Sequence, residues 1–128
     1  MQEALSPLEI GVMLLTCEHK VMYPRVRSFV DKELNPHILE WEKVGIWPVR
    51  EVLRKMGKLG LLGIAIPEAY GGLGLDYSYD VVFAQALGNC NSGSLPMAIG
   101  VQTDMATPAL ARFGSEELCK EYLVPAIT

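Results

Sequence analysis

Apolar residues recur at helical spacing along most of this chain, and a single short segment has the composition of a buried strand. That segment, residues 61–67, has no second strand pattern with which it could pair. We therefore expect an extended connector there, between helices. The pattern predicts an all-α fold, an up-and-down bundle of five to six helices.

The first predicted helix lies within residues 14–41, after a leader at residues 1–13 to which the sequence assigns no role. Pro24 is expected in its first turn, where a missing N–H costs little, and Pro36 is expected to end or kink it. We expect a short helical continuation at residues 37–42. Four apolar residues form the predicted buried face: Val26, Phe29, Val30 and Leu34.

Local signals predict the boundaries of other helices. Pro48 opens the second helix. Residues 71–74 are rich in glycine and predict a tight turn, followed by Asp76 as the N-cap of the next helix. Ser115 is expected to cap a last helix at residues 116–123. The apolar stripe of the second helix consists of Val49, Val52, Leu53, Met56 and Leu59.

Residues 77–87 and 94–113 predict two helices that lie deep in the core, because apolar residues surround the axis of each. Pro96 falls in the first turn of the second of them, where proline is tolerated. Pro108 falls in its middle and predicts a kink or a local loss of hydrogen bonds.

The glycines at residues 71–74 also raise the question of a phosphate-binding loop, since glycine lets backbone N–H groups approach an anion. Their spacing matches neither G-x-G-x-x-G nor the P-loop pattern, and no parallel strand precedes them. We interpret the segment as a structural turn.

The polar residues do not assemble into a catalytic or metal-binding motif. His19 and His37 have no ligand-type partner at metal-binding spacing and are expected at the surface. Ser92 and Ser94 are expected to cap a helix, because no orienting base lies near them. Asp104 lies between apolar turns, so we expect it either to be hydrogen-bonded inside the protein or to face a cavity.

One group of apolar residues at helical spacing has two explanations. Methionine adapts to irregular apolar ligands, so the group is compatible with a pocket for an alkyl chain. Ordinary core packing explains the same spacing, and composition leaves both explanations open. The group consists of Met97, Ala98, Val101 and Met105.

The composition restricts the classes of partner. A net charge of -4 without a run rich in Lys and Arg argues against nucleic acid. No apolar run approaches the ~20 residues that span a bilayer, so we expect no membrane span. The three cysteines are far apart and are expected to be reduced. The first residues lack a secretory or transit signal.

Three segments resemble one known family in sequence, order and spacing. They are residues 26–36 (VRSFVDKELNP), residues 60–74 (GLLGIAIPEAYGGLG) and residues 113–125 (FGSEELCKEYLVP). The first resembles the opening helix of acyl-CoA dehydrogenases, the second their most recognisable N-terminal stretch, and the third their FGSEEQK-type helix. Residues 14–128 are therefore expected to form an acyl-CoA dehydrogenase N-terminal-like helical domain.

The resemblance implies α,β-dehydrogenation of an acyl-CoA thioester. In the family, a glutamate takes the α-proton and the β-hydrogen leaves as hydride to the flavin of FAD. Electrons then pass to an electron-transferring flavoprotein. The glutamate and most flavin contacts belong to a middle β-domain and a C-terminal domain, which are absent from this sequence. The resemblance also places Met97, Ala98, Val101 and Met105 in the wall of the acyl-chain cavity.

Two hypotheses about function follow. In the first, the chain is the N-terminal domain of an FAD-dependent acyl-CoA dehydrogenase and is inactive and without cofactor on its own. In the second, it is a non-catalytic truncated helical module that binds lipid or protein. Both predict exposed helix faces and hence self-association or low stability. The family implies a mitochondrial location, with the peroxisome or cytoplasm as alternatives.

Overall fold

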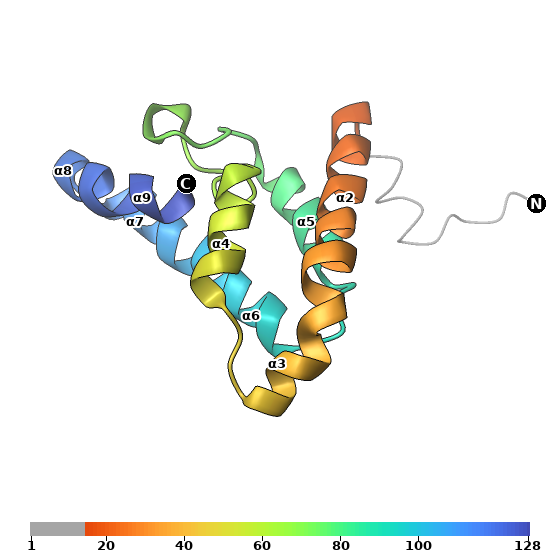
Figure 1. The fold of residues 1–128 in the computed structure, drawn as a ribbon. Coiled ribbons are helices and arrows are strands. Elements are labelled where there is room, and N and C mark those ends of the chain that lie inside the picture. Colours follow the sequence, from red (N-terminus) through yellow and green to blue (C-terminus); the bar gives the residue numbers. More distant parts are fainter. Residues whose placement is uncertain (1–14) are drawn as a thin grey trace, which may run out of the picture.

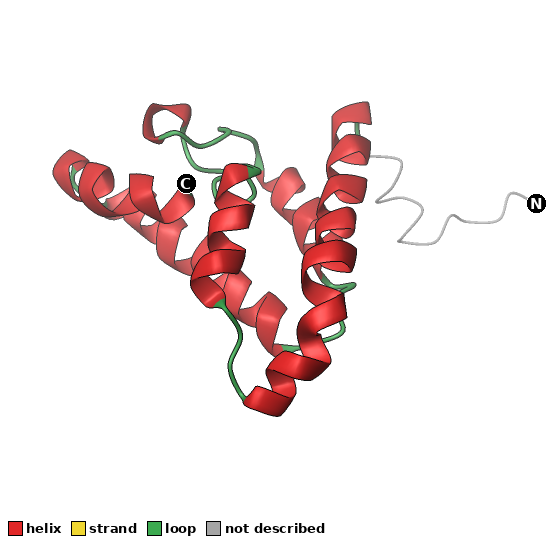
Figure 2. Cartoon of the chain, in the orientation of Figure 1, coloured by secondary structure: helices red, strands yellow, loops and turns green. Residues whose placement is uncertain are grey.

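The computed structural model describes residues 15–128, and the leader predicted at residues 1–13 lies outside them. Helices joined by loops make up this part of the chain, which contains no strand (Figures 1 and 2). The described residues form five main helical segments. The predicted all-α fold is therefore confirmed.

The first segment is one long helical rod that bends near Pro36 and turns into α3 at the lower end of Figure 1. The bend confirms the predicted effect of this proline. Pro24 was predicted in the first turn but lies well inside the helix, because the helix begins earlier, with Thr16 as its N-cap. The segment comprises α2 (Cys17–Phe29), η1 (Val30–Leu34), η2 (Asn35–His37) and α3 (Ile38–Val44).

The helices α4 (Val49–Lys58) and α5 (Tyr77–Leu87) begin at the predicted signals. Pro48 precedes α4, and the carboxylate of Asp76 accepts a hydrogen bond of 2.9 Å from the backbone N–H of Ser78 at the start of α5. Because α2 packs along α5, the starts of these two helices lie side by side.

The connector, residues 61–67, joins α4 to a short turn, η3 (Glu68–Tyr70). It forms turns and bends and not the extended path expected from the sequence, and the Ile66 N–H bonds back to the Gly63 carbonyl oxygen at 3.3 Å. The glycine turn at residues 71–74 then folds back onto the connector. A Cβ atom on Gly72 would lie 2.0 Å from the carbonyl oxygen of Ile66, so only glycine fits there. This close approach buries four connector side chains: Leu61, Leu62, Ile64 and Ile66.

The predicted helix at residues 94–113 is continuous and contains a π-helical turn in its middle. It comprises α6 (Ser94–Gly100), η4 (Val101–Ala106) and α7 (Thr107–Phe113). The wide turn η4 immediately precedes Pro108, whose missing N–H breaks the regular hydrogen-bond ladder. The carbonyl oxygen of Gln102, at the start of this turn, accepts from both the backbone N–H and the hydroxyl of Thr107, the latter at 2.8 Å.

The last segment comprises α8 (Glu116–Leu118), η5 (Cys119–Leu123) and α9 (Val124–Ile127). Ser115 caps it as predicted, accepting a hydrogen bond from the Leu118 N–H. The helix was predicted to end at Leu123 but continues to Ile127. The Ile127 side chain is buried, and it packs against Gly63 of the connector. This contact explains why the helix extends beyond its predicted end.

The core lies where α2, α4, α5 and α6 meet the connector. Its side chains with almost no exposed surface include Val26, Val30, Leu34, Met56, Ile99 and Leu123. The predicted buried face of the first helix is thus confirmed. In the second helix, Val52 and Met56 are buried, whereas Val49 and Leu59 at the ends of the stripe are exposed.

Candidate functional site

One face of α6 and η4 carries the four apolar residues predicted from the sequence, and it is exposed. We call Met97, Ala98, Val101 and Met105 the outer face. Met97 is 69%, Val101 45% and Met105 65% exposed. The interpretation of these residues as ordinary core packing is therefore wrong, and so is the prediction that this helix lies deep in the core. The opposite side of the helix, with Leu95 and Ile99, does face the core.

The helix α5 shows the same division into two sides. Val82 and Phe83 are buried as predicted, but Tyr77 is 76% and Val81 53% exposed. Apolar side chains of this size rarely remain in contact with water over a contiguous area without a binding role. The outer face is therefore the candidate binding surface, because the sequence pattern groups its residues and the structure exposes them.

Asp104 is exposed, so the prediction that it is hydrogen-bonded inside the protein is wrong. The alternative, that it faces a cavity, stays a prediction. The neighbouring carboxylate of Asp80 lines a cavity, of about 230 Å³, between the connector and α7. Burial raises the pKa of Asp80 to about 6, and the negative charges of Asp104 and Asp76 add to the shift. No local pattern marks Asp80, because its burial comes from segments that are distant in sequence.

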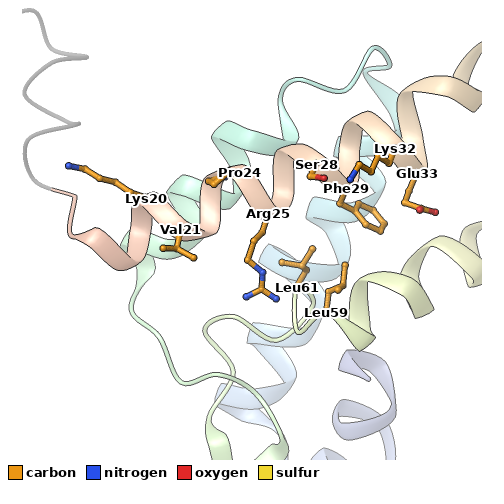
Figure 3. A pocket seen from close by; sticks show the side chains of 10 residues that line it. All are labelled: Lys20, Val21, Pro24, Arg25, Ser28, Phe29, Lys32, Glu33, Leu59 and Leu61. Carbon is orange, nitrogen blue, oxygen red and sulfur yellow. The ribbon is translucent and has the colours of Figure 1, made fainter.

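A larger groove lies between α2 and the end of α4, with a volume of about 660 Å³ (Figure 3). Val21, Pro24 and Phe29 on α2 face Leu59 and Leu61 across it. Figure 3 shows the Arg25 side chain reaching from α2 toward this apolar wall. The groove is thus apolar inside, with positive charge at its edge.

Three cations line the groove: Lys20, Arg25 and Lys32. None of them takes part in the ion pairs found among residues 15–128, whereas Glu33, the acid of the groove, pairs with Lys55 at 2.8 Å. The groove therefore presents net positive charge to a partner. The groove was not predicted from the sequence, although positions 21, 25, 28 and 32 follow helical spacing along one face of α2 and η1.

The glycine turn at residues 71–74 does not offer a phosphate site. Its backbone N–H groups donate to carbonyl oxygens of the protein: Gly72 to Pro67 at 3.2 Å, Leu73 to Gly63 at 2.8 Å and Gly74 to Ile66 at 2.9 Å. An FAD pyrophosphate would have to displace these bonds. The turn therefore does not fit a pyrophosphate group, and its interpretation as a structural turn is supported.

The two histidines differ, contrary to prediction. His37 is exposed as expected, whereas His19 is only 5% exposed and is hydrogen-bonded. Ser92 and Ser94 do not cap α6 through their side chains; their hydroxyl oxygens lie 3.0 Å apart. Within the described residues, no group of His, Cys, Asp and Glu side chains has the geometry of a metal site.

The three cysteines are free thiols, as predicted. Cys119 is buried, Cys90 is half-buried and Cys17 is exposed. Burial raises the pKa of the Cys90 thiol, which disfavours the reactive thiolate. Every helix within residues 15–128 is too short or too polar to cross a bilayer.

Residues 16–128 match the model of the acyl-CoA dehydrogenase N-terminal domain. This match covers nearly the whole described chain. The chain belongs to the acyl-CoA dehydrogenase family. The expectation raised by residues 26–36, 60–74 and 113–125 is thereby confirmed.

Known acyl-CoA dehydrogenases extend far beyond the part they share with this chain. The long-chain specific enzyme of pig mitochondria is 39% identical over 123 residues, which are 94% of this chain but 27% of that protein. A probable acyl-CoA dehydrogenase of Bacillus subtilis is 33% identical over 84% of the chain and 18% of its own length. The family thus includes mitochondrial and bacterial members.

Solved structures agree with the sequence comparison. The acyl-CoA dehydrogenase of Geobacillus kaustophilus superposes with a TM-score of 0.81 at 38% identity, covering 89% of this chain and 29% of that one. A structure described as the electron transferring flavoprotein of Acidaminococcus fermentans gives 0.78 at 30% identity, covering 88% and 29%. In each case the shared part is less than a third of the solved chain.

Proposed function

We propose that this domain serves an FAD-dependent acyl-CoA dehydrogenase, in which the outer face forms part of the wall of the acyl-chain cavity. The observation that supports this role is the exposure of Met97, Val101 and Met105 along one side of a helix whose other side is in the core. Flexible thioethers flanking a β-branched residue suit an apolar ligand of variable shape.

The reaction implied by the family is the formation of a double bond between the α- and β-carbons of an acyl-CoA thioester. A base removes the α-proton, and FAD, when bound in the whole enzyme, accepts the β-hydrogen as hydride. We expect base and flavin to be supplied by other parts of the enzyme. This domain would exclude water from the alkyl chain and hold that chain in place. A fixed chain keeps the α- and β-carbons oriented for the reaction.

The Val101→Trp substitution in the full-length enzyme tests the cavity. The larger side chain should occlude the far end of the cavity, so activity with long acyl-CoA substrates should fall while activity with short ones remains. Dye-linked kcat/KM across a series of chain lengths measures this. Val44→Trp, at a position 67% exposed on α3, is the matched control and should leave the profile unchanged. An unchanged profile for Val101→Trp would remove this residue from the site.

A second role, protein binding, is favoured by the groove beside α2. We propose that its partner is the electron-transferring flavoprotein implied by the family. The partner would contribute a segment with one aliphatic side chain between acidic residues. The aliphatic side chain would enter between Val21 and Leu61, and the acids would meet Arg25 and its neighbouring cations.

Charge reversal in the groove tests this second role. Arg25→Glu should slow association with the flavoprotein and weaken its salt dependence, because the cations steer the encounter. Arg50→Glu makes the same charge change at an exposed position of α4 outside the groove, and it serves as the control. Equal effects of both substitutions would point to net charge alone and contradict docking at the groove. Dye-linked activity should be unaltered in either variant.

We propose a mitochondrial location, in line with the pig relative. Bacterial relatives make a cytoplasmic location the alternative, and the peroxisome is a third. Fractionation of cells that express the full-length protein distinguishes them. Co-sedimentation with a matrix marker is expected, and recovery with peroxisomal or cytosolic markers would contradict the proposal.

A further inference from the structure

We propose that His19 is an acid-sensitive clasp that joins the starts of α2 and α5, holding them together when neutral and releasing the first turn of α2 when protonated. The proposal concerns this domain itself and does not depend on the reaction of the whole enzyme. It rests on the hydrogen-bond partners of the two ring nitrogens.

The imidazole of His19 bridges the two helices. Its Nε2 atom lies 2.6 Å from the hydroxyl oxygen of Ser78 on α5. Its Nδ1 atom lies 3.1 Å from the backbone nitrogen of Thr16 and 2.8 Å from the Thr16 hydroxyl oxygen. The ring also stacks on Tyr79, with centroids 3.8 Å apart. All these contacts are made by a side chain that is 5% exposed.

The partners determine which ring nitrogen carries the hydrogen. The hydroxyl of Ser78 donates its single hydrogen to the carboxylate of Asp76. Its oxygen can therefore only accept from His19, so Nε2 must carry a hydrogen. The backbone N–H of Thr16 is a donor, so Nδ1 must present its lone pair. Both requirements are met only by the neutral ring with its hydrogen on Nε2.

The Asp76 carboxylate keeps this arrangement in place. The hydrogen bonds from the Ser78 hydroxyl and backbone N–H lower the pKa of Asp76, so that it remains an acceptor in mildly acidic solution. The hydrogen of Ser78 therefore stays directed toward Asp76 while the ring gains a proton.

A second proton on His19 removes an acceptor that α2 needs. In a capping box, the third residue of a helix accepts a hydrogen bond from the N-cap N–H, and His19 has that role toward Thr16. Protonated Nδ1 could still donate to the Thr16 hydroxyl oxygen, 2.8 Å away, but it could no longer accept from the Thr16 N–H, toward which it would present a hydrogen. The new positive charge would also lie at the positive end of the α2 dipole.

Among residues 15–128, the other charged or titratable groups that bond to or stack on this cluster are Glu18 on α2, Asp76 at the N-cap of α5 and Tyr79 on α5. The Tyr79 hydroxyl donates a 2.8 Å hydrogen bond to Glu18, a second link between the helices. The two carboxylates attract an imidazolium and oppose release. They cannot replace the lost acceptor, because neither contacts the Thr16 N–H. Since Lys20 and Val21 follow directly, release would also move the edge of the groove.

Nitrogen NMR of the histidine rings in the 128-residue chain tests the proposal, with His37 as an internal reference. At about pH 8, where histidine is neutral, His19 should show the Nε2–H tautomer. On acidification to about pH 5, hydrogen-exchange protection at residues 19–21 should fall about tenfold or more as His19 gains its proton. Protection in α4 should not change. A neutral Nδ1–H tautomer would overturn the proposal, as would full protection with His19 protonated.

His19→Asn supplies a matched variant, because its side-chain oxygen can accept from Thr16 without gaining a proton. Its protection at residues 19–21 should be independent of pH over the same range. His37→Asn is the control and should retain the acid-dependent loss. If His19→Asn keeps the acid-dependent loss, the clasp is contradicted. The tautomer measurement on the unmodified chain decides the proposal if that variant does not fold.

Discussion

The connector and the outer face are both apolar in sequence, yet they have opposite environments in the structure. Leu61 is 5% exposed, and Leu62, Ile64 and Ile66 are 3% exposed, whereas residues of the outer face reach 69%. The glycine turn and α9 cover the connector within this chain. The outer face has no such cover among the described residues. An apolar sequence alone therefore does not determine whether a side chain is buried. The segments that pack over it do.

The largest expected effect comes from opening the cover of the connector. Gly72→Ala would place a methyl group against the Ile66 carbonyl, which must shift, so we expect a loss of about 3 kcal/mol or more in the free energy of unfolding. Gly93→Ala has open space around it and should change stability by no more than about 0.5 kcal/mol. Urea titration measures both. Similar values for the two variants would contradict the close approach at Gly72.

Truncation of one side chain in each region compares them directly. Ile64→Ala should lower the unfolding free energy by about 2–5 kcal/mol, because it leaves a cavity in the core. Met105→Ala should change it by less than about 0.5 kcal/mol, because that side chain is in contact with water. An equal loss of unfolding free energy for Met105→Ala and Ile64→Ala would show that the Met105 side chain is buried, which would contradict the exposure of the outer face.

Self-association of the 128-residue chain is expected, since exposed apolar surface favours contact between copies. Val101→Lys should weaken it about tenfold, which corresponds to roughly 1.4 kcal/mol. Val44→Lys makes the same change on α3 and should have less effect. Sedimentation velocity over a concentration series measures the association. A stable monomer at high concentration, without any substitution, would contradict the prediction.

The smallest effect concerns Asp80, which lies between the two regions. Its pKa in the folded chain is raised to about 6, so the folded state favours the protonated carboxyl and loses stability as the pH rises from about 4 to 6. Asp80→Asn should remove this slope and stabilise the chain at neutral pH by about 1 kcal/mol or less, given the partial exposure. Thermal unfolding at several pH values measures it. An unchanged slope would contradict the assignment.

Helix boundaries could be predicted because their signals are local. Pro48, Asp76 and Ser115 act on the residues next to them, and each begins a helix as predicted. The end at Leu123 was wrong because the continuation depends on Ile127 meeting Gly63, a contact between distant segments.

Burial could not be predicted in the same way. Met97 and Ile99 are two residues apart and both apolar, and only their orientation on the helix separates an exposed side chain from a buried one. His19 was expected at the surface because its partner Ser78 lies 59 residues away in sequence. Sequence spacing could group the four residues of the outer face, but it could not show that this side of the helix is the exposed one.

Photo-crosslinking is the most direct test of whether the outer face contacts an acyl chain. The full-length enzyme would be loaded with an acyl-CoA that carries a diazirine near the end of its chain, irradiated and digested for mass spectrometry. We expect adducts within residues 97–105, and competition by unlabelled substrate should remove them. Competable adducts confined to other parts of the enzyme would contradict the assignment of the outer face to the acyl-chain cavity.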